Sequence, residues 1–322
     1  MSYKPPFTIT TKILNLVASI SEKVGAMKNS PLNTSPELRK QNRIKTITGT
    51  LAIEGNTLTE EQITAVLEGK RVMGTPRELA EVTGAIKAYD ALNKLSYLDI
   101  TDIQTAHKLM MGDILADAGS FRTKSVGIHK GKDVVHIAPQ ANMVSGLMSE
   151  LFKWLKSGDA HPLITSTVFH YEFEFIHPFI DGNGRMGRLW QTLILAQWNP
   201  IFLNLPLESI IKDNQEGYYK SLEQSDATGN SSIFIEFMLK TIDRTLTQNA
   251  TVNATANATV KKKTPDAIVE LILNNGSITR KEMATTLGKD ITTIARAIKK
   301  LQVAGRVKRV GSDKTGHWEI ID

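Results

Sequence analysis

The feature that most constrains the fold is a polar, glycine-rich segment between two long apolar stretches. Residues 177–188 read His-Pro-Phe-Ile-Asp-Gly-Asn-Gly-Arg-Met-Gly-Arg. An apolar helical pattern begins at Leu163 and runs into this segment, and a second one leaves it through Leu189 and Leu193 to Trp198. A helix that is apolar on every side is buried. We therefore predict a loop that joins two buried helices and opens the second of them.

The rest of the first 250 residues also favours helices. Ser35 is followed by proline, the pattern of an N-cap with proline at the first helical position. Thr59, Thr75 and Thr101 each begin a capping box, with Glu or Gln three residues later. One stretch differs, because valine and isoleucine flank a polar centre within residues 126–137. This pattern predicts a short β-hairpin in a mainly helical body.

Residues 264–322 form a second compact pattern. A short amphipathic helix is followed by a capping box at Thr279 and by Asp290, which caps a third helix. Apolar residues at 307–310 and 318–320 then bracket a glycine-containing loop. Three helices followed by a two-stranded wing predict a winged helix-turn-helix.

The segment between these two parts, 249–263, repeats the unit Asn-Ala-Thr every four residues. It has too few large apolar side chains to bury, so we predict a linker or a solvated helical spacer. Charge divides at the same place: residues 261–322 hold 13 Lys+Arg and 7 Asp+Glu, an excess of six that equals the net charge of the whole chain. A neutral body with a basic tail suggests that the tail contacts an anionic polymer.

Composition excludes several other classes. The chain has no cysteine, which excludes disulfides, thiolate metal sites and a cysteine nucleophile. No apolar run reaches 18 residues, so we expect no membrane span. The amino-terminal residues lack the apolar stretch of a signal peptide, and we expect a soluble cytoplasmic protein.

Each residue of the central loop has an ordinary explanation when taken alone, but together they favour an anion site. Glycines beside a helix N-terminus expose backbone N–H groups that bind phosphate oxygens. Arg185 and Arg188 share one face of the first turn, where the helix dipole disfavours cations and a bound anion would offset that cost. Asp181 offers a hard oxygen ligand for Mg²⁺, and His177 can accept a hydroxyl proton near neutral pH. A P-loop would need Lys-Ser/Thr after the glycines, and the EF-hand pattern is broken at Arg185 and Met186.

The loop resembles the full signature of the Fic family, His-x-Phe-x-Asp/Glu-Gly-Asn-Gly-Arg-x-x-Arg, in at least eight specified positions of twelve. The wider resemblance runs from about residue 35 to 245 and includes Gly-Ser-Phe-Arg at 119–122. It implies a mainly α fold: a Fic-type helical bundle with a β-hairpin flap, followed here by the small winged helix-turn-helix domain. The expected domains are an N-terminal helical region (1–105), a catalytic core (106–248), the linker (249–263) and the winged helix-turn-helix (264–322).

The resemblance implies a protein adenylyltransferase, which transfers AMP from ATP to a Tyr, Thr or Ser hydroxyl of a protein. His177 would deprotonate that hydroxyl, Asp181 would hold Mg²⁺, and Phe179 would anchor the loop in the core. The phosphates would contact the remaining loop residues, namely Gly182, Asn183, Gly184, Arg185 and Arg188. Doc-like kinases of this fold carry Lys at position 184, so Gly184 favours AMP transfer over phosphate transfer.

Two more elements are implied by the resemblance. The hairpin would dock the target by adding a target strand to its edge, through Val126, Gly127, Ile128, Val134, Val135 and His136. Tyr218 and Tyr219 resemble the tyrosines that flank the nucleotide base. From the residues alone, a purely structural hairpin and two core tyrosines stay open as alternatives.

The helix expected at about 36–54 also resembles a family element. It ends with Gly55, a natural stop residue, and Glu54 lies where the helix dipole disfavours a carboxylate. Thr50 to Gly55 resembles the inhibitory motif Ser/Thr-x-x-x-Glu-Gly/Asn of the subgroup with an amino-terminal brake. The resemblance implies that Glu54 pairs with Arg188, displaces the γ-phosphate of ATP and misaligns the α-phosphorus.

The tail carries its own functional prediction. The third helix of a winged helix-turn-helix usually enters the major groove of DNA. The residues that would contact DNA lie on that helix and on the wing: Thr292, Thr293, Arg296, Lys299, Lys308 and Arg309. A solvated charged face or a protein-docking module is the alternative.

Three functions stay open from the sequence. The first is an autoinhibited protein adenylyltransferase that uses ATP and Mg²⁺ and modifies an unidentified target protein or itself. The second is a DNA-binding regulator that uses the Fic core as a nucleotide sensor, although an intact His177 argues against a pure sensor. The third is a Fic enzyme that removes AMP or transfers another nucleotide. No membrane partner is expected, and a homo-oligomer is compatible with the sequence.

Overall fold

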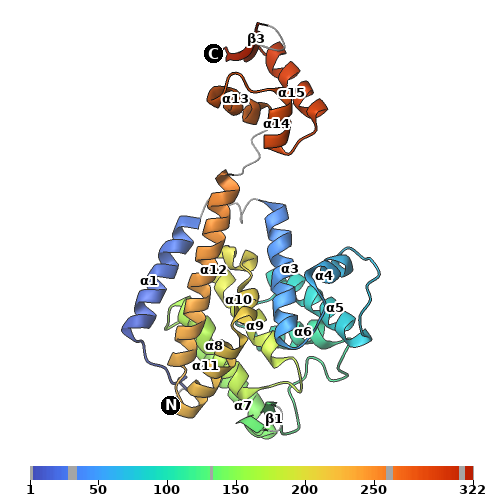
Figure 1. Cartoon of the computed structure of the whole chain (residues 1–322). Helices are drawn as coiled ribbons and strands as arrows, with labels where there is room; N and C mark the ends of the chain where they lie inside the picture. Colours follow the sequence, from blue (N-terminus) through green and yellow to red (C-terminus); the bar gives the residue numbers. More distant parts are fainter. Residues whose placement is uncertain (1–2, 28–34, 131–132, 259–263, 312–315, 322) are drawn as a thin grey trace. The chain divides into compact units, whose positions relative to one another are not determined.

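The structure is a computed structural model that describes residues 3–27, 35–130, 133–258, 264–311 and 316–321. The chain divides into two compact units, Met1–Thr251 and Val252–Asp322. Helices dominate both units, and each unit contains one two-stranded antiparallel sheet (Figure 1). The mainly α fold class is therefore confirmed. Within the described ranges, no helix is both long and apolar enough to cross a membrane.

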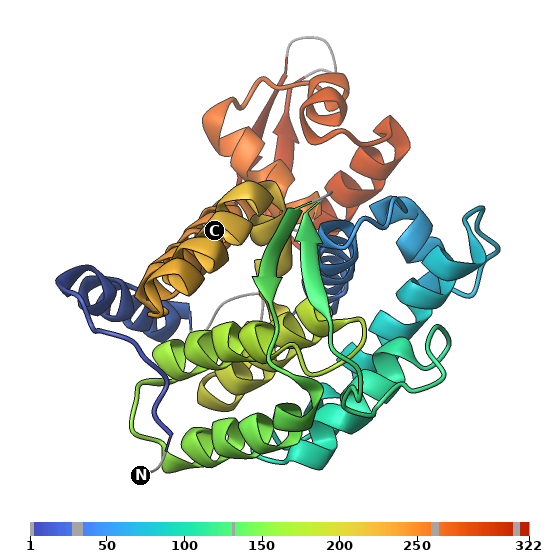
Figure 2. The same cartoon turned by 90° about the horizontal axis from the view of Figure 1, so that it is seen from below.

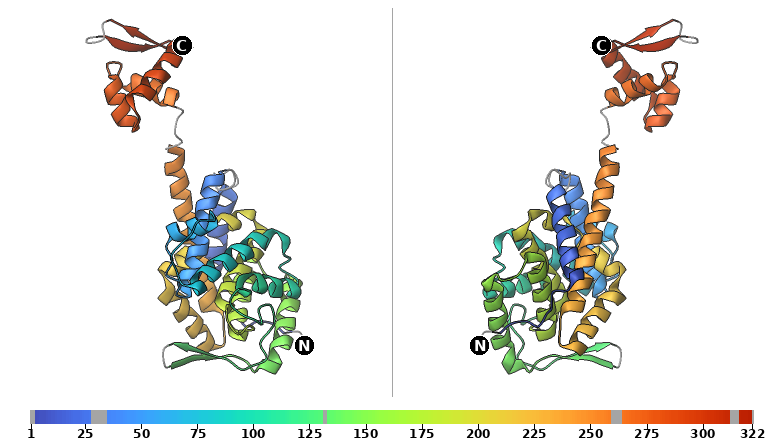
Figure 3. Two further views of the ribbon diagram at one scale, coloured as in Figure 1. Left: turned by 90° about the vertical axis from the view of Figure 1, so that its right-hand side faces the viewer. Right: turned by 90° about the vertical axis from the view of Figure 1, so that its left-hand side faces the viewer.

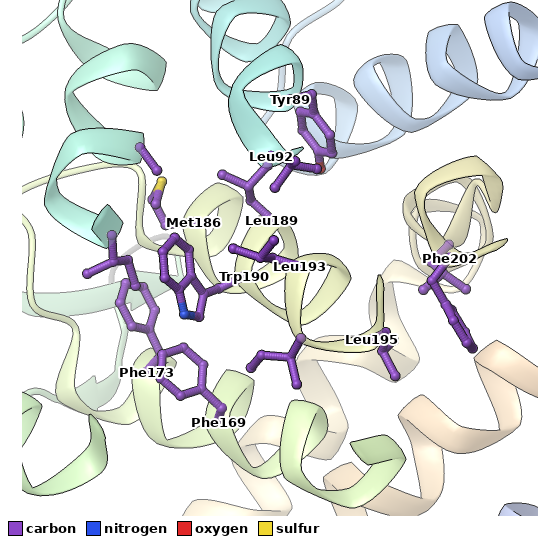
Figure 4. Close-up of a cluster of buried hydrophobic side chains, with 14 of the residues drawn as sticks. Tyr89, Leu92, Phe169, Phe173, Met186, Leu189, Trp190, Leu193, Leu195 and Phe202 are labelled. Carbon is purple, nitrogen blue, oxygen red and sulfur yellow. The ribbon is translucent and has the colours of Figure 1, made fainter. Parts of the chain in front are cut away.

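Two buried helices form the centre of the first unit, α8 (Pro162–Ile176) and α9 (Asn183–Trp198). Twelve of the 15 residues of α8 and 13 of the 16 residues of α9 are buried. Phe169 of α8 and Trp190 of α9 both contact Phe152, with ring centroids 5.5 and 6.3 Å away. Figure 4 shows Trp190 among other buried side chains of the two helices, including Phe169 and Phe173. Burial on all sides is what the continuous apolar pattern predicts. The loop at residues 177–182 therefore connects two buried helices.

The remaining helices of this unit surround that pair. They are α1 (Thr11–Ala26), α3 (Pro36–Ile53), α4 (Glu60–Leu67), α5 (Pro76–Ala91), α6 (Ile100–Met111), α7 (Ala141–Ser157), α10 (Leu207–Asp213), α11 (Gln215–Thr228) and α12 (Ser232–Ala258), with short 3-10 turns at Leu92–Lys94 and Pro200–Asn204. Glycine lets two of the pairs approach closely. A Cβ at Gly84 of α5 would lie 2.0 Å from the Met110 carbonyl oxygen of α6, and one at Gly49 of α3 would lie 2.7 Å from the Glu208 backbone of α10.

The amino-terminal segment is tied to α12. Ser19 and Lys23 of α1 both bond to Asp243, at 2.8 and 2.7 Å, and α1 runs beside α12 in both views of Figure 3. Before α1, the Ser231 N–H donates to the carbonyl oxygen of Pro6 at 2.9 Å. These contacts join residues that are more than 200 positions apart in the sequence, so the two ends of the first unit pack against each other.

The predicted hairpin is present as β1 (Gly127–Lys130) and β2 (Asp133–Ile137), seen as two green arrows in Figure 2. Its register pairs Gly127 with Ile137 and Ile128 with His136, and the register shifts after Ile128. The strands extend further than expected, because His129 and Lys130 belong to β1 instead of the connecting loop. β2 approaches α11, which carries the two candidate tyrosines.

The second unit has the predicted order of three helices and a two-stranded wing: α13 (Thr264–Asn274), α14 (Arg280–Leu287), α15 (Ile291–Val303), β3 (Val307–Val310) and β4 (His317–Ile320). The capping box at Thr279 and the Asp290 cap both form. Ile268, Ile294, Ile298 and Trp318 are buried in a core of this unit's own residues. The winged helix-turn-helix prediction is therefore confirmed.

One sequence expectation needs correction in detail. The capping boxes at Thr59 and Thr75 form, but α6 begins at Ile100 and is capped by Asp99, so Thr101 lies inside the helix. Asp99 precedes the threonine and its carboxylate accepts the Thr101 N–H at 2.8 Å, which makes it the better placed cap. For the segment 249–263, predicted as a linker or a solvated helical spacer, the structure shows residues 249–258 as a helical continuation of α12, and 259–263 lie outside the described residues.

Candidate active site

His177 ends α8 in an unusual backbone conformation. Its φ of 50° makes it the one described non-glycine residue with positive φ, and its N–H still donates to the Phe173 carbonyl oxygen at 2.9 Å. Such a conformation is uncommon outside glycine and persists only where the surroundings enforce it. The imidazole is near Glu174, whose backbone oxygen is 3.4 Å from Nδ1 and whose carboxylate is 4.0 Å away.

Arg122 is the residue that enforces this turn, and the sequence reasoning had given it no role. Its buried guanidinium donates to the carbonyl oxygens of His177 at 2.7 Å, Ile176 at 3.2 Å and Pro139 at 2.6 Å. Its backbone N–H donates to Pro178 O at 2.8 Å. Arg122 and Pro139 lie on either side of the hairpin in sequence, so one side chain connects the base of the flap to the catalytic loop.

The floor of the loop is a stacked pair of rings. Phe179 is buried, as expected, and lies 3.7 Å from the ring of His107, with the two planes almost parallel. His107 Nδ1 accepts the Gly119 N–H at 2.8 Å, so Nε2 carries the proton and donates to Asp181 O at 2.9 Å. Burial lowers the pKa of His107 to about 4, which keeps the ring neutral at physiological pH. No pattern in the sequence distinguishes His107 from an ordinary core residue of α6.

Asn183 closes the loop with its side chain. Its Oδ1 accepts the Phe179 N–H and its Nδ2 donates to Phe179 O, both at 2.9 Å, and the residue is buried. The amide group is therefore committed to the loop itself. Any phosphate contact at this position must come from the backbone N–H groups at the start of α9, where the helix dipole also favours an anion.

Four charged side chains form a ring beside the loop. Asp181 Oδ1 is 3.2 Å from Arg185 Nη2, and Asp181 Oδ2 is 2.9 Å from Arg77 Nη2. Glu81 Oε1 closes the ring at 3.4 Å from Arg185 and 3.3 Å from Arg77, and the other oxygen of Glu81 accepts from Asn56 at 2.9 Å. Arg77 and Glu81 come from α5, outside the loop. Their i,i+4 spacing on a capped helix was the one sequence signal for this pair.

This ring bears on the expected magnesium and phosphate sites. Asp181 is partly exposed and is a hard oxygen ligand beside a helix N-terminus, which suits a cation held jointly with phosphates. Arg185 is buried, and its Nε and Nη1 atoms have no hydrogen-bond partner among the described residues. Buried donors of this kind normally have partners, so the site has donors to offer to an anion. The described side chains contain no group of three or more acidic or histidine ligands for a metal, and phosphates would have to complete the coordination.

Arg188 is held by the end of α3. Its Nη2 donates to Glu54 Oε1 at 2.6 Å and to Thr50 O at 3.2 Å, and its Nε donates to Thr50 Oγ1 at 3.0 Å. Burial alone would lower the pKa of Arg188, but the charge of Glu54 and its hydrogen bond raise it above the ordinary value. Glu54 is the C-cap residue of α3 and Gly55 follows with φ of 89°. The pair that the inhibitory motif implies is thus formed.

Gly184 lies directly against this pair. A Cβ at Gly184 would be 2.5 Å from Glu54 Oε1 and 3.1 Å from Arg188 Nη1. The first distance is far below van der Waals contact, so any side chain here would displace the carboxylate. Glycine at this position therefore leaves room for the Glu54–Arg188 contact as it stands.

The two candidate tyrosines differ sharply in exposure. Tyr218 is buried in a cluster with Phe234 and Met238, and its hydroxyl is 3.0 Å from His170 Nε2. Tyr219 is 41% exposed, and its hydroxyl reaches the Ile53 carbonyl oxygen at 3.5 Å. An adenine ring could therefore stack on Tyr219 but not on the face of Tyr218 without rearrangement. The side chains of the flap residues 127–137 lie outside what the structure describes.

In the second unit, the candidate DNA contacts are of two kinds. On α15, Thr292, Arg296 and Lys299 are exposed and Thr293 is half-buried. On the wing, Lys308 pairs with Glu319 at 2.8 Å and the Arg309 guanidinium lies 5.0 Å from the centre of the Trp318 ring. The helix therefore offers free cationic groups, while the wing cations are already engaged within the domain.

A helical bundle with this loop between two buried helices, an adjoining hairpin and an acidic helix end against the last arginine defines a Fic-type domain. The Fic/DOC family matches residues 97–195, and a winged helix-turn-helix DNA-binding family matches 267–308. A Fic family protein from Desulfovibrio desulfuricans G20 has a solved structure that is 39% identical, with a TM-score of 0.77, and the match covers 99% of this chain and 98% of that one. The chain belongs to the Fic family.

Curated relatives are more distant. The protein adenylyltransferase Fic of Nematostella vectensis is 29% identical over 247 residues, which cover 71% of this chain and 54% of the relative. The protein of the same name from Aedes aegypti is 28% identical over 219 residues, which cover 64% and 41%. The chain thus spans about half the length of these relatives. The solved Fic-1 of C. elegans, 24% identical with a TM-score of 0.58, shares the fold.

Proposed function

We propose that the protein is an autoinhibited protein adenylyltransferase that transfers AMP from ATP to a protein hydroxyl. The relatives named protein adenylyltransferase Fic support this activity. The observation that carries the proposal is the pair of hydrogen bonds from Arg188 to Glu54 and Thr50, beside an otherwise complete Fic loop. The target, on this chain or another, carries a Tyr, Thr or Ser hydroxyl.

The reaction follows from the placement of the loop. His177, fixed by Arg122 beneath it, takes the proton of the target hydroxyl as its oxygen attacks the α-phosphorus. The bond to the β-phosphate oxygen breaks and pyrophosphate leaves. The N–H groups at the start of α9 and the guanidinium of Arg185 stabilise the charge on the phosphates. Asp181 would hold Mg²⁺, which when bound supplies further neutralisation of phosphate charge.

Inhibition follows from competition for Arg188. In the structure, the Arg188 guanidinium makes three hydrogen bonds to Thr50 and Glu54 at the end of α3. ATP can enter while Glu54 stays in place, but the Glu54 carboxylate repels the γ-phosphate, so the α-phosphorus is turned away from the attacking oxygen. Release of Glu54 would free Arg188 to bind the γ-phosphate.

The test uses α-³²P-ATP with Mg²⁺ and follows label on every protein band, including the enzyme. Three proteins are compared: wild type, Glu54→Gly, and Glu54→Gly combined with His177→Ala. We expect label with the single variant only. Strong labelling by wild type equal to that by Glu54→Gly would exclude the brake, and labelling by the double variant would exclude His177 as the base.

For the second unit we propose binding to duplex DNA through α15. The match to a winged helix-turn-helix DNA-binding family and the exposed Arg296 and Lys299 support this function. The measurement is fluorescence anisotropy with labelled duplex at about 50 and 200 mM salt. We expect affinity to fall steeply with salt, because phosphate contacts release counterions. Replacement of Arg296 and Lys299 by alanine should weaken binding, and negligible binding at both salt concentrations would refute it.

A further inference from the structure

Arg77 reaches the active loop from a separate helix. It lies in the first turn of α5, 104 residues away from Asp181 in sequence, and its Nη2 is 2.9 Å from Asp181 Oδ2. The side chain is 62% exposed and has one other partner, Glu81, at 3.3 Å. Exposed ion pairs contribute little to stability. The Arg77–Asp181 pair therefore adds little to the stability of the fold.

Both oxygens of Asp181 are engaged. Oδ1 accepts the Gly182 N–H at 2.7 Å and lies 3.2 Å from Arg185, while Oδ2 faces Arg77. A cation that binds Asp181 through Oδ2 competes with Arg77, and one that binds through Oδ1 competes with Arg185 and the Gly182 N–H. Arg185 is buried and is fixed on its other side by Glu81, whereas Arg77 stands at the surface. Arg77 is therefore the partner that leaves.

The charges of the four side chains Arg77, Glu81, Asp181 and Arg185 determine when Arg77 leaves Asp181. Arg77 and Arg185 are balanced by Asp181 and Glu81, so a divalent cation that enters alone leaves two positive charges uncompensated. Nucleotide phosphates that arrive with the cation supply the missing negative charge.

From this we infer that Arg77 is a positioning residue that holds Asp181 while the metal is absent and makes metal entry depend on nucleotide phosphates. The inference rests on the proposed function, because it takes Asp181 as the metal ligand. Arg77 acts on the carboxylate and needs no contact with the reacting atoms. Metal alone then binds weakly, and metal and nucleotide each strengthen the binding of the other, as linkage requires.

The probe is Mn²⁺ with the full chain, and free Mn²⁺ is measured by electron paramagnetic resonance without nucleotide. The proteins are wild type, Arg77→Ala, Asp181→Asn and Lys87→Ala. Lys87 is a matched control, because it is also on α5 and forms an exposed pair, with Asp113 at 2.7 Å. Calorimetric titration with ADP, with and without Mn²⁺, gives the factor by which the metal strengthens nucleotide binding.

We expect Arg77→Ala to bind Mn²⁺ alone roughly three- to tenfold more tightly than wild type, since a competing ion pair and a nearby like charge are removed. The strengthening of ADP binding by Mn²⁺ should shrink by a similar factor. Lys87→Ala should match wild type, and Asp181→Asn should lose Mn²⁺ binding.

Two results overturn the inference in different ways. If Asp181→Asn loses Mn²⁺ while Arg77→Ala and wild type bind it equally, Arg77 has no such role and the metal assignment of Asp181 stands. If Asp181→Asn binds Mn²⁺ as wild type does, the metal assignment itself fails and the role of Arg77 fails with it. An equal gain in Lys87→Ala would assign the effect to general surface charge and would also refute the inference.

Discussion

Thr50 offers a way to weaken the proposed brake without removing its carboxylate. Its hydroxyl is fully buried and accepts from Arg188 Nε at 3.0 Å, beside the Glu54 contact at 2.6 Å. Thr50→Val keeps the shape of the side chain and removes the hydroxyl, which accepts from Arg188 and also interacts with the Tyr89 hydroxyl. The Thr50 carbonyl oxygen still accepts from Nη2, so Arg188 stays roughly in place.

The expected size of the effect follows from the lost bond. A hydrogen bond to a charged group contributes about 1.5–3 kcal/mol, and each 1.4 kcal/mol is a factor of ten. If the bond exists only when Glu54 holds Arg188, the fraction of released enzyme should rise roughly ten- to hundredfold. The rate of AMP labelling from α-³²P-ATP should rise with it, toward but not beyond the rate of Glu54→Gly.

The double variant Thr50→Val with Glu54→Gly tests whether the Thr50–Arg188 hydrogen bond exists only while Glu54 holds Arg188. If the Thr50 bond belongs to the inhibited arrangement alone, the double variant labels as fast as Glu54→Gly, and the two changes are not additive. If labelling by Thr50→Val stays at the wild-type level, with unchanged thermal stability and an active Glu54→Gly, the contribution of Thr50 to the brake is refuted. A double variant slower than Glu54→Gly would show that Thr50 supports Arg188 in the active state.

Two further predictions concern stability. The pKa of His107 is lowered to about 4 from 6.5, so the folded state binds fewer protons than the unfolded state between these values, and the His107 contribution of up to about 3 kcal/mol is lost as pH falls through that range. His107→Gln should therefore flatten the fall in melting temperature between pH 7 and 5. Burial raises the pKa of Glu172 to about 7, which makes stability rise as pH falls, but this effect is the same in both proteins. Equal pH profiles of wild type and His107→Gln would contradict the lowered pKa of His107. Gly84→Ala should destabilise the protein by about 1–3 kcal/mol or more, because its Cβ would meet the Met110 carbonyl. Gly146→Ala is the control: its Cβ has nothing within 4 Å and should stabilise the protein by up to about 1 kcal/mol. Thermal unfolding measures both, and a neutral Gly84→Ala would refute the tight α5–α6 contact.

Local patterns allowed much of the fold to be predicted. The buried pair α8 and α9, the hairpin and the three tail helices each follow from side-chain periodicity or caps within a few residues. The start of α6 was misplaced for the same reason, because Asp99 and Thr101 are both good caps and only the folded backbone decides between them. The helical course of 249–258 depends on continuation from the buried part of α12, not on the polar repeat itself.

The site was predictable where its residues lie in a recognisable motif, as the loop 177–188 and the Glu54–Arg188 pair do. Arg122, His107 and Arg77 reach the loop from other elements. Arg122 lies in the Gly-Ser-Phe-Arg segment of the family resemblance but was given no contact, and His107 and Arg77 carry no motif that identifies them. Asn183 shows that a motif residue can have a structural role that the motif does not reveal. Both polar atoms of its side chain bond to the Phe179 backbone and hold the loop in shape. Partners that are about 55–105 residues apart in sequence become visible only when the chain is folded.

The two phosphate-facing arginines are held by carboxylates of different character. Both are buried, but only Arg185, the third residue of α9, lies in the first turn, where the helix dipole disfavours a cation; Arg188 is the sixth residue and lies beyond that turn, unlike the sequence expectation. Arg185 faces Glu81, which is nearly buried at 9% side-chain exposure and is fixed by Asn56, whereas Arg188 faces Glu54, which is 27% exposed and ends a helix. Desolvated and anchored charges separate reluctantly, while a partly exposed carboxylate at a helix end can exchange with water. In the proposed mechanism, Glu81 therefore stays as the counter-ion of Arg185, and Glu54 is the carboxylate that a γ-phosphate would replace.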